Sequence, residues 1–320
     1  MIDRRALPAV LASMAGWRGA GAAEPATRPL TLVVPFPAGS VTDGVARALA
    51  APLQEALGQP VLVDNRAGAQ GTLGAALVAR SPADGHTLLV ASSLLFVARS
   101  LYRMLPYDPV ESFRPVSGIG ATCMVFLVGG ASPIRSVAEL AARAGRQDPP
   151  LSVAYGSPSG QVALALFAAA SGTRPVAVSY RGIPQAMTDL VGGHVEAAVV
   201  DLGSALAQAK AGGIRPLATS AGSRSALAPE IPVLREAFPD AAAALETMIA
   251  LVAPAGTPAA TVGRIDAAIR AALARPAVRQ QFATLATAPL PLGPEALGQR
   301  IGTDNARWEA LIRQAGIERE

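Results

Sequence analysis

The chain has 320 residues, of which 51% are hydrophobic, and its formal net charge is +4. This length and hydrophobic content suffice for two domains, each with its own core. No apolar run approaches the ~20 residues that a membrane-spanning helix needs, so we expect the mature protein to be soluble. Lys210 is the one lysine, and the arginines are scattered without interleaved aromatic residues, which argues against a nucleic-acid partner.

Cys123 is the one cysteine of the chain. A single cysteine excludes an internal disulfide and any multi-cysteine metal site. Because its neighbours are apolar, we interpret Cys123 as a small core residue. The two histidines, His86 and His194, are far apart in the sequence, so we expect neither a metal site nor a cofactor.

Residues 1–26 have the pattern of an export signal. Arg4 and Arg5 precede a modest apolar segment, Ala6–Ala15, and small residues suited to cleavage follow. We expect export and cleavage near Ala22 or Ala23; the alternative is an untargeted N-terminal tail.

The first predicted elements are a strand, a tight loop and a helix. Leu30–Val34 is short, apolar and partly β-branched, and the prolines that follow it prevent its continuation. After Gly39 the apolar residues recur at helical spacing, with Thr42 or Asp43 available as N-cap. A loop that leads into a helix N-terminus gathers backbone N–H groups and the positive end of the helix dipole, which predicts an anion site.

A second strand, Val61–Asp64, leads into the glycine-rich turn Asn65–Gly74 and a helix near Leu73–Arg80. The glycines permit close approach of the backbone. The turn has neither the dinucleotide-binding fingerprint nor the Gly-Lys-Ser/Thr ending of a Walker loop. A ligand-binding loop and a plain structural turn therefore both remain open here.

Strands and helices then alternate along the chain, which predicts an α/β fold with mostly parallel sheets flanked by helices. The further strands are expected at Thr87–Ala91, Cys123–Val128, Leu151–Tyr155, Val176–Tyr180, Val195–Val200, Leu217–Thr219 and Thr247–Ala253. The further helices are expected at Val137–Ala144, Gln161–Ala170 and Pro184–Gly192, with two more after a cap and first-turn proline at Thr257–Pro258.

The apolar runs near residues 124 and 249 suit strands that cross between domains. We therefore predict a discontinuous first domain, residues 27–124 plus 249–320, and a second domain, residues 125–248.

In open α/β sheets, ligands bind outside the carboxyl ends of the strands. The residues at these ends are mostly glycine, serine, threonine and amide residues, which donate neutral hydrogen bonds at close range. They lie at 35–43, 65–71, 92–93, 156–160, 180–181 and 201. This composition suits a small, oxygen-rich anion.

Hydrolase chemistry does not fit this edge of the sheets. His86 and His194 precede their strands, so neither can act as a base at the carboxyl ends. The segment Gly156–Gly160 has proline where a nucleophile elbow carries serine. We expect no enzyme.

Asp43 and Asp201 can face the cleft and receive a ligand ammonium or hydroxyl, although Asp43 fits first-turn placement in a helix equally well.

Short motifs along the chain, in a shared order, resemble those of the Bug-type receptors of tripartite tricarboxylate transporters. The resemblance covers the chain from residue 28 onward. The motifs are Val34–Gly39 with Asp43 and Arg47, Gly58–Val61, Asp64–Arg66, Gly68–Gly71, Asp84–Leu89, Leu105–Pro109, Tyr180–Gly182, Thr188–Gly193, Ala253–Pro258 and Trp308–Ile317.

The resemblance implies a two-domain, type II-like periplasmic binding protein, a monomer with its cleft between the domains. Such a receptor closes on the carboxylate of a small organic acid or amino acid and delivers it to inner-membrane transporter subunits. The resemblance places one carboxylate between Phe36–Asp43 and Ala67–Gly71, held by backbone groups and ordered waters. The expected ligand-binding residues are Phe36, Ala38, Gly39, Ser40, Thr42, Asp43, Ala69, Gly71, Ser92, Ser93, Ser157, Ser159, Gln161, Arg181 and Asp201.

The chain departs from the family pattern at three places. Ser40 stands where a second glycine is usual, Gly160–Leu164 lacks the usual histidine, and Ser179 stands where proline is commoner. These departures leave the identity of the ligand open. The alternatives to transport are a sensor that presents its ligand to a membrane signalling partner, and an enzyme on the same bilobal scaffold.

Overall fold

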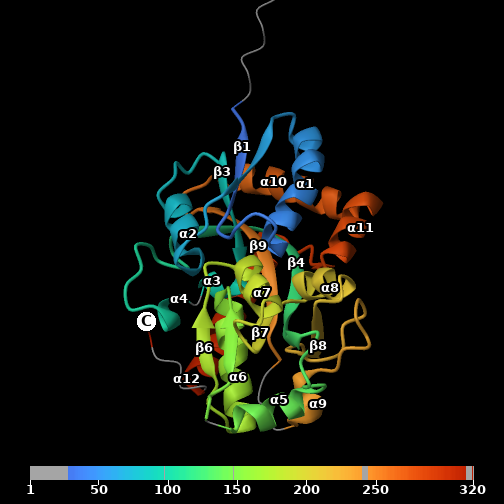
Figure 1. Ribbon diagram of the computed structural model, residues 1–320. Coiled ribbons are helices and arrows are strands. Elements are labelled where there is room, and N and C mark those ends of the chain that lie inside the picture. The colour runs from blue at the N-terminus through green and yellow to red at the C-terminus, as the bar shows by residue number, and fades with distance from the viewer. Residues whose placement is uncertain (1–27, 97, 147, 240–243, 315–318, 320) are drawn as a thin grey trace, which may run out of the picture.

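The computed structural model describes residues 28–96, 98–146, 148–239, 244–314 and 319, and the expected signal segment, 1–26, lies outside them. The described chain forms a ten-stranded sheet with helices on both faces (Figure 1). The strands are β1 (Leu30–Val34), β2 (Val61–Asn65), β3 (Thr87–Ser92), β4 (Phe113–Gly129), β5 (Ser152–Tyr155), β6 (Val176–Ser179), β7 (Ala197–Asp201), β8 (Ile214–Thr219), β9 (Glu246–Pro254) and β10 (Ala288–Pro289). The helices are α1 (Val41–Leu57), η1 (Ala69–Gly71), α2 (Thr72–Ala79), α3 (Ser93–Phe96), α4 (Ala98–Leu101), α5 (Val137–Ala144), α6 (Pro158–Ser171), α7 (Ile183–Val191), α8 (Leu202–Lys210), α9 (Leu234–Ala237), α10 (Ala259–Ala274), α11 (Pro276–Thr284) and α12 (Pro294–Gln314).

The strand order is β2-β1-β3-β9-β4-β7-β5-β6, with β8 and β10 pairing to β4 beside this path. β1 pairs in parallel with β2 and β3, and β5 pairs in parallel with β6 and β7. We call the half built on β1–β3 the first lobe and the half built on β5–β8 the second lobe; they are the upper and lower halves of Figure 1. The helices on both faces confirm the expected α/β architecture. The sheet is mixed and not mostly parallel, because every pair that includes β4 or β9 is antiparallel.

β4 belongs to both lobes. Its segment Phe113–Cys123 pairs antiparallel with β9, and its segment Met124–Val128 pairs antiparallel with β7. β9 in turn pairs antiparallel with β3 of the first lobe. β4 therefore carries the chain from the first lobe into the second, and the chain is back among the first-lobe strands when β9 begins.

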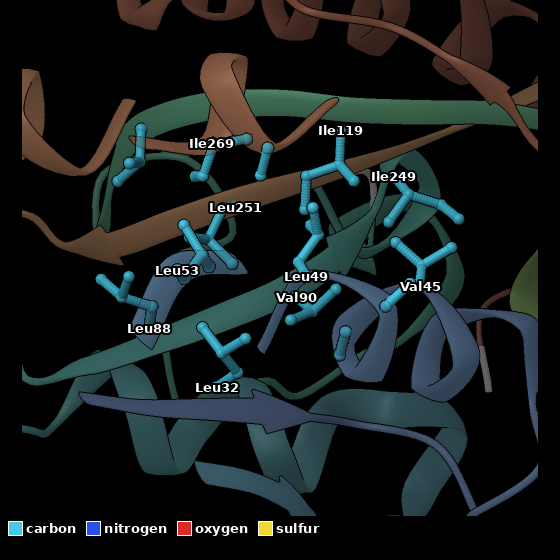
Figure 2. Packing of buried hydrophobic residues seen from close by; sticks show 14 of the residues in the cluster. Leu32, Val45, Leu49, Leu53, Leu88, Val90, Ile119, Ile249, Leu251 and Ile269 are labelled. Atoms are coloured by element: carbon cyan, nitrogen blue, oxygen red, sulfur yellow. The ribbon is translucent and has the colours of Figure 1, made fainter. Parts of the chain in front are cut away.

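Both faces of the first-lobe sheet are buried, because successive side chains of a strand point to opposite faces. Leu32 of β1 lies in a cluster with α1, α10 and α11, whereas its neighbour Val33 lies in a cluster with α2 and the start of α12. Figure 2 shows the first cluster, to which α1 contributes Leu49 and α10 contributes Ile269.

The second lobe repeats this arrangement. Phe126 of β4 lies in a cluster with residues of α5, α6 and the later part of α12. Val125 and Leu127 face the other side and pack with residues of α7 and α8. Each lobe thus has helices over both faces of its strands.

The last helix, α12, contacts both lobes. Leu297 and Ile301, near its start, pack in a first-lobe cluster, whereas Trp308 packs farther along in the cluster of Phe126 and Phe167. The expected domain boundaries, with all of 249–320 in the first domain, stay a prediction. The packing adds that the last described turns of α12 lie on the second lobe.

Several helix starts differ from those expected. α6 begins at Pro158 and not at Gln161, because Ser157 is its N-cap. Ser40, and not Thr42 or Asp43, is the N-cap of α1, because Ser40 is the residue with extended backbone whose Oγ accepts from the Asp43 N–H. The expected start of α10 is also wrong by one residue, since Pro258 is its N-cap and the helix begins at Ala259. α8 has no expected counterpart, because its buried positions are mostly small and give little amphipathic signal.

Trp308→Ala should lower the free energy of unfolding by about 3–5 kcal/mol, because truncating a fully buried tryptophan leaves a large cavity. Trp308 is 1% exposed. Urea unfolding followed by circular dichroism measures the loss. Glu309→Ala, at the exposed next position, is the control and should change stability by less than ~0.5 kcal/mol. A similarly small change for Trp308→Ala would contradict the packing of α12 on the second lobe.

Candidate functional site

A cavity of about 50 Å³ lies between the two lobes. It is bounded by residues that follow β1, β5 and β6, by the last residues of β3 and β7, and by the strands β4 and β9. The carboxyl ends of both sets of parallel strands therefore meet at this cavity, as expected for ligand sites of open α/β sheets. The lining residues are Phe36, Pro37, Ser40, Val41, Thr42, Ser92, Thr122, Met124, Gly156, Ser157, Ser159, Gly182, Ile183, Asp201, Thr247 and Ile249.

Four helices begin at the cavity, and their N-cap residues all line it. Ser40 caps α1, Ser157 caps α6, Gly182 caps α7 and Asp201 caps α8. The first N–H groups of a helix have no partner within the helix, and the helix dipole makes this end positive. The site therefore has a positive potential that comes from backbone groups of both lobes, which suits an anion.

Serine and threonine hydroxyls supply further donors at short range. Ser40 Oγ accepts from the Asp43 N–H at 3.3 Å, and Ser157 Oγ accepts from the Gly160 N–H at 3.2 Å. A hydroxyl that accepts in this way can still donate its own proton to a ligand oxygen. Ser92 Oγ is buried at the cavity and has no hydrogen-bond partner among the described residues. A buried hydroxyl without a partner lowers the stability of the folded protein unless a ligand or a water molecule forms a hydrogen bond with it.

Asp43 fixes the loop between β1 and α1. Its carboxylate accepts from the Gly39 N–H at 3.0 Å and from Asn65 Nδ2 at 3.0 Å, and Arg47 Nε lies 3.0 Å away. Burial by itself raises the pKa of Asp43, but these hydrogen bonds, that from Arg47 first, outweigh burial and hold the pKa below its usual value. Asp43 is thus occupied by its own loop and does not line the cavity.

Asp201 lies at the cavity, at the N-terminus of α8. Its Oδ1 accepts from the Ser204 N–H at 2.7 Å, and its Oδ2 accepts from Ser204 Oγ at 3.0 Å. Burial raises the pKa of Asp201, and the bonds from Ser204 only partly oppose this effect. Among the described residues that line the cavity, Asp201 alone is ionisable. An anion in this cavity would therefore meet neutral donors and no fixed cation.

The other walls of the cavity are apolar, with Phe36, Pro37, Met124, Ile183 and Ile249. They exclude water and match the carbon chain of a small organic ligand. Within the described ranges, no group of three or more histidine, cysteine, aspartate or glutamate residues lies where it could hold a metal ion. None of the described helices is long and apolar enough to cross a membrane.

The structure brings about half of the expected site residues to the cavity. Those that line it are Phe36, Ser40, Thr42, Ser92, Ser157, Ser159 and Asp201. Those that do not line it are Ala38, Gly39, Asp43, Ala69, Gly71, Gln161 and Arg181. The side chain of Ser93 lies outside the described part of the structure. A role of any of these residues in ligand binding stays a prediction.

Sequence reasoning missed the residues contributed by the crossing strands. Thr122 and Met124 of β4 and Thr247 and Ile249 of β9 line the cavity although they lie within strands. A search of strand ends does not reach them. The sequence signal that could have found them is their position in the apolar segments near residues 124 and 249. These segments are expected to connect the two domains, and a cleft between domains is bounded by the segments that connect them.

Asp43→Asn should lower the free energy of unfolding at pH 7 by about 1–3 kcal/mol, because hydrogen bonds to a charged carboxylate are lost. Since the pKa of Asp43 is lowered on folding from 3.8, its stabilisation is present above that value and is lost as the pH falls through the folded pKa. Thermal melts at pH 7 and at about pH 3 should show a smaller gap between variant and wild type in acid. Asp64→Asn, which removes a half-exposed surface pair with Arg66, is the control. An equal gap at both pH values would contradict this account.

Comparison with known proteins agrees with this geometry. The sequence profile of the tripartite tricarboxylate transporter family receptors matches residues 45–317. BugT of Bordetella pertussis is 33% identical over 296 residues, which cover 91% of this chain and 90% of BugT.

Two solved structures also superpose on most of the chain. The periplasmic binding protein BugD gives a TM-score of 0.85 at 28% identity, over 92% of this chain and 99% of BugD. A Rhodopseudomonas palustris protein solved with adipate gives a TM-score of 0.86 at 31% identity, over 92% of this chain and 99% of that protein. The chain therefore belongs to the tripartite tricarboxylate transporter family receptors, the Bug-type periplasmic solute-binding proteins.

Proposed function

We propose that this protein captures a small carboxylate in the cavity between its lobes and delivers it to inner-membrane transporter subunits. The observation that carries the proposal is the convergence of four helix N-caps, from both lobes, on one cavity. Donors from both lobes can hold an anion only when the lobes are together, so binding and closure are coupled. Export through the N-terminal segment, with cleavage near Ala22 or Ala23, is part of the proposal.

The neutral donors suit a ligand that must be released again. Charge-assisted hydrogen bonds contribute roughly 1.5–3 kcal/mol each, and a micromolar Kd corresponds to about 8 kcal/mol. Four to six such bonds reach that affinity after ordering costs, without a buried arginine or lysine. Adipate in the related R. palustris protein supports an organic acid with an apolar chain as the ligand class. We propose a receptor role without catalysis.

Adipate and other C3–C6 carboxylates should raise the melting temperature of the protein if one of them is the ligand. A ligand at 100 times its Kd stabilises the folded state by about 2.7 kcal/mol, a shift of roughly 4 °C for a chain of this size. Differential scanning fluorimetry measures the shift. The matched controls are the corresponding diamides and diols, which keep the chain length and lack the negative charge. The absence of a shift with every carboxylate would count against the proposal, and a ligand chemically altered after incubation would favour an enzyme.

Asp201→Asn should remove a pH dependence of carboxylate binding. Because the pKa of Asp201 is raised, the carboxyl is neutral below that pKa, and it becomes a like charge beside the ligand as the pH rises through it. Wild-type affinity for a ligand anion should then fall by up to about tenfold per pH unit. Isothermal titration calorimetry between pH 5 and 8 measures how the affinity changes with pH. Asp64→Asn is the control and should show the same pH dependence as the wild type. An affinity that rises with pH in the wild type would instead assign Asp201 to a ligand ammonium.

A further inference from the structure

Gln70 joins the two lobes at a place outside the cavity lining. It belongs to η1 of the first lobe, and its Nε2 donates to Ser179 Oγ at 3.0 Å and to the Tyr180 carbonyl at 3.2 Å. Ser179 and Tyr180 lie at the carboxyl end of β6, in the second lobe. A single side chain therefore makes two hydrogen bonds across the cleft.

The backbone of Gln70 is in a conformation that disfavours a side chain. Its φ is +52°, and Ala69 before it has a φ of +44°. A left-handed conformation costs a residue other than glycine roughly 1–2 kcal/mol, and glycine is the usual solution. Gly68 and Gly71, on either side, also have positive φ. A glutamine retained between them points to a role for its side chain.

The receiving side of the contact is rigid and fixes the orientation of the amide. The Tyr180 N–H donates to the Tyr155 carbonyl at 2.9 Å, and the Tyr180 hydroxyl donates to Asp189 at 2.7 Å. Because a backbone carbonyl can only accept, the amide must turn its Nε2 to Tyr180. Gln70 Oε1 is then buried without a partner within the described chain.

A second contact lies beside this one. A Cβ atom on Gly182 of the second lobe would lie 2.6 Å from Cγ of Pro37 in the first lobe, so only glycine allows the lobes to approach this closely. Pro37 and Gly182 both line the cavity. The hydrogen bonds of Gln70 thus act where the lobes close directly over the ligand space.

We infer that Gln70 is a positioning residue that acts as a latch: it holds the lobes closed over the ligand and slows ligand release. This inference rests on the proposed function, since a latch has a use only in a protein that opens and closes. Ser179 completes the latch, because its Oγ accepts one of the two hydrogen bonds from Nε2.

The test measures the distance between the lobes in variants of the full mature chain. Spin labels on cysteines that replace Leu77 of α2 and Gln185 of α7, both exposed, report opening by pulsed electron resonance. Cys123 is buried, and its burial is the main reason why the pKa of its thiol is raised to about 12. The spin label should therefore not react with Cys123. Distances are recorded without ligand and with adipate as the probe.

Gln70→Gly should reduce the ratio of closed to open molecules about tenfold, which corresponds to about 1.4 kcal/mol for two hydrogen bonds. Glycine relieves the left-handed backbone, so the melting temperature should not fall, which separates a latch from a structural role. Gln70→Glu keeps the length but cannot donate, and should open the lobes at least as much. Gln280→Ala, on an exposed position of α11, is the control and should match the wild type.

Each outcome decides the inference. Equal fractions of closed molecules in Gln70→Gly and the wild type would overturn the latch. A wild type that shows no closed molecules, with or without adipate, would overturn it as well. If adipate leaves the wild-type distances unchanged while Gln70→Gly still opens the ligand-free protein, the latch stands and adipate is excluded as the ligand. If adipate closes wild type and variant alike and their ligand-free distances also agree, the receptor function stands and the latch fails.

Discussion

The antiparallel pairing of β4 with β9 is the constraint on which both lobes and the site between them depend. β4 pairs with β9 up to Cys123 and with β7 from Met124, so one strand continues from the first lobe into the second. Residues of both strands form part of the cavity wall, including Thr122 and Thr247. A bend in these strands would move the lobes relative to each other and change the cavity at the same time.

The same topology explains how the proposed site can attract an anion without a fixed cation. Because the parallel strands of each lobe end at the cleft, the helices that follow them begin there, and four N-caps meet at one cavity. Asp43 supports this arrangement from behind, since it ties Gly39 to Asn65 and Arg47 and holds the start of α1 in place. Asp201, with its raised pKa, then makes the charge of the cavity depend on pH.

Contacts between the lobes lie at the cavity itself. Pro37 and Gly182 approach too closely for any side chain on the glycine, and both line the cavity. Gln70 adds two hydrogen bonds nearby at the cost of a left-handed backbone. Contacts of this kind contribute little to the stability of either lobe alone, so they adjust the balance between open and closed forms.

The sequence by itself determined the main strands, because apolar patterns and turn residues are local signals. Its short motifs in a shared order indicated the family by resemblance. It also placed Ser157 and Asp201 at strand ends, where the structure has them at the cavity. The cap of α1 by Ser40 is a local contact with the Asp43 N–H. Only the tertiary structure decided that Asp43 accepts from Asn65 and that Thr122 and Thr247 face the cavity. These outcomes depend on contacts between segments far apart in the chain, and no local pattern of residue types contains that information.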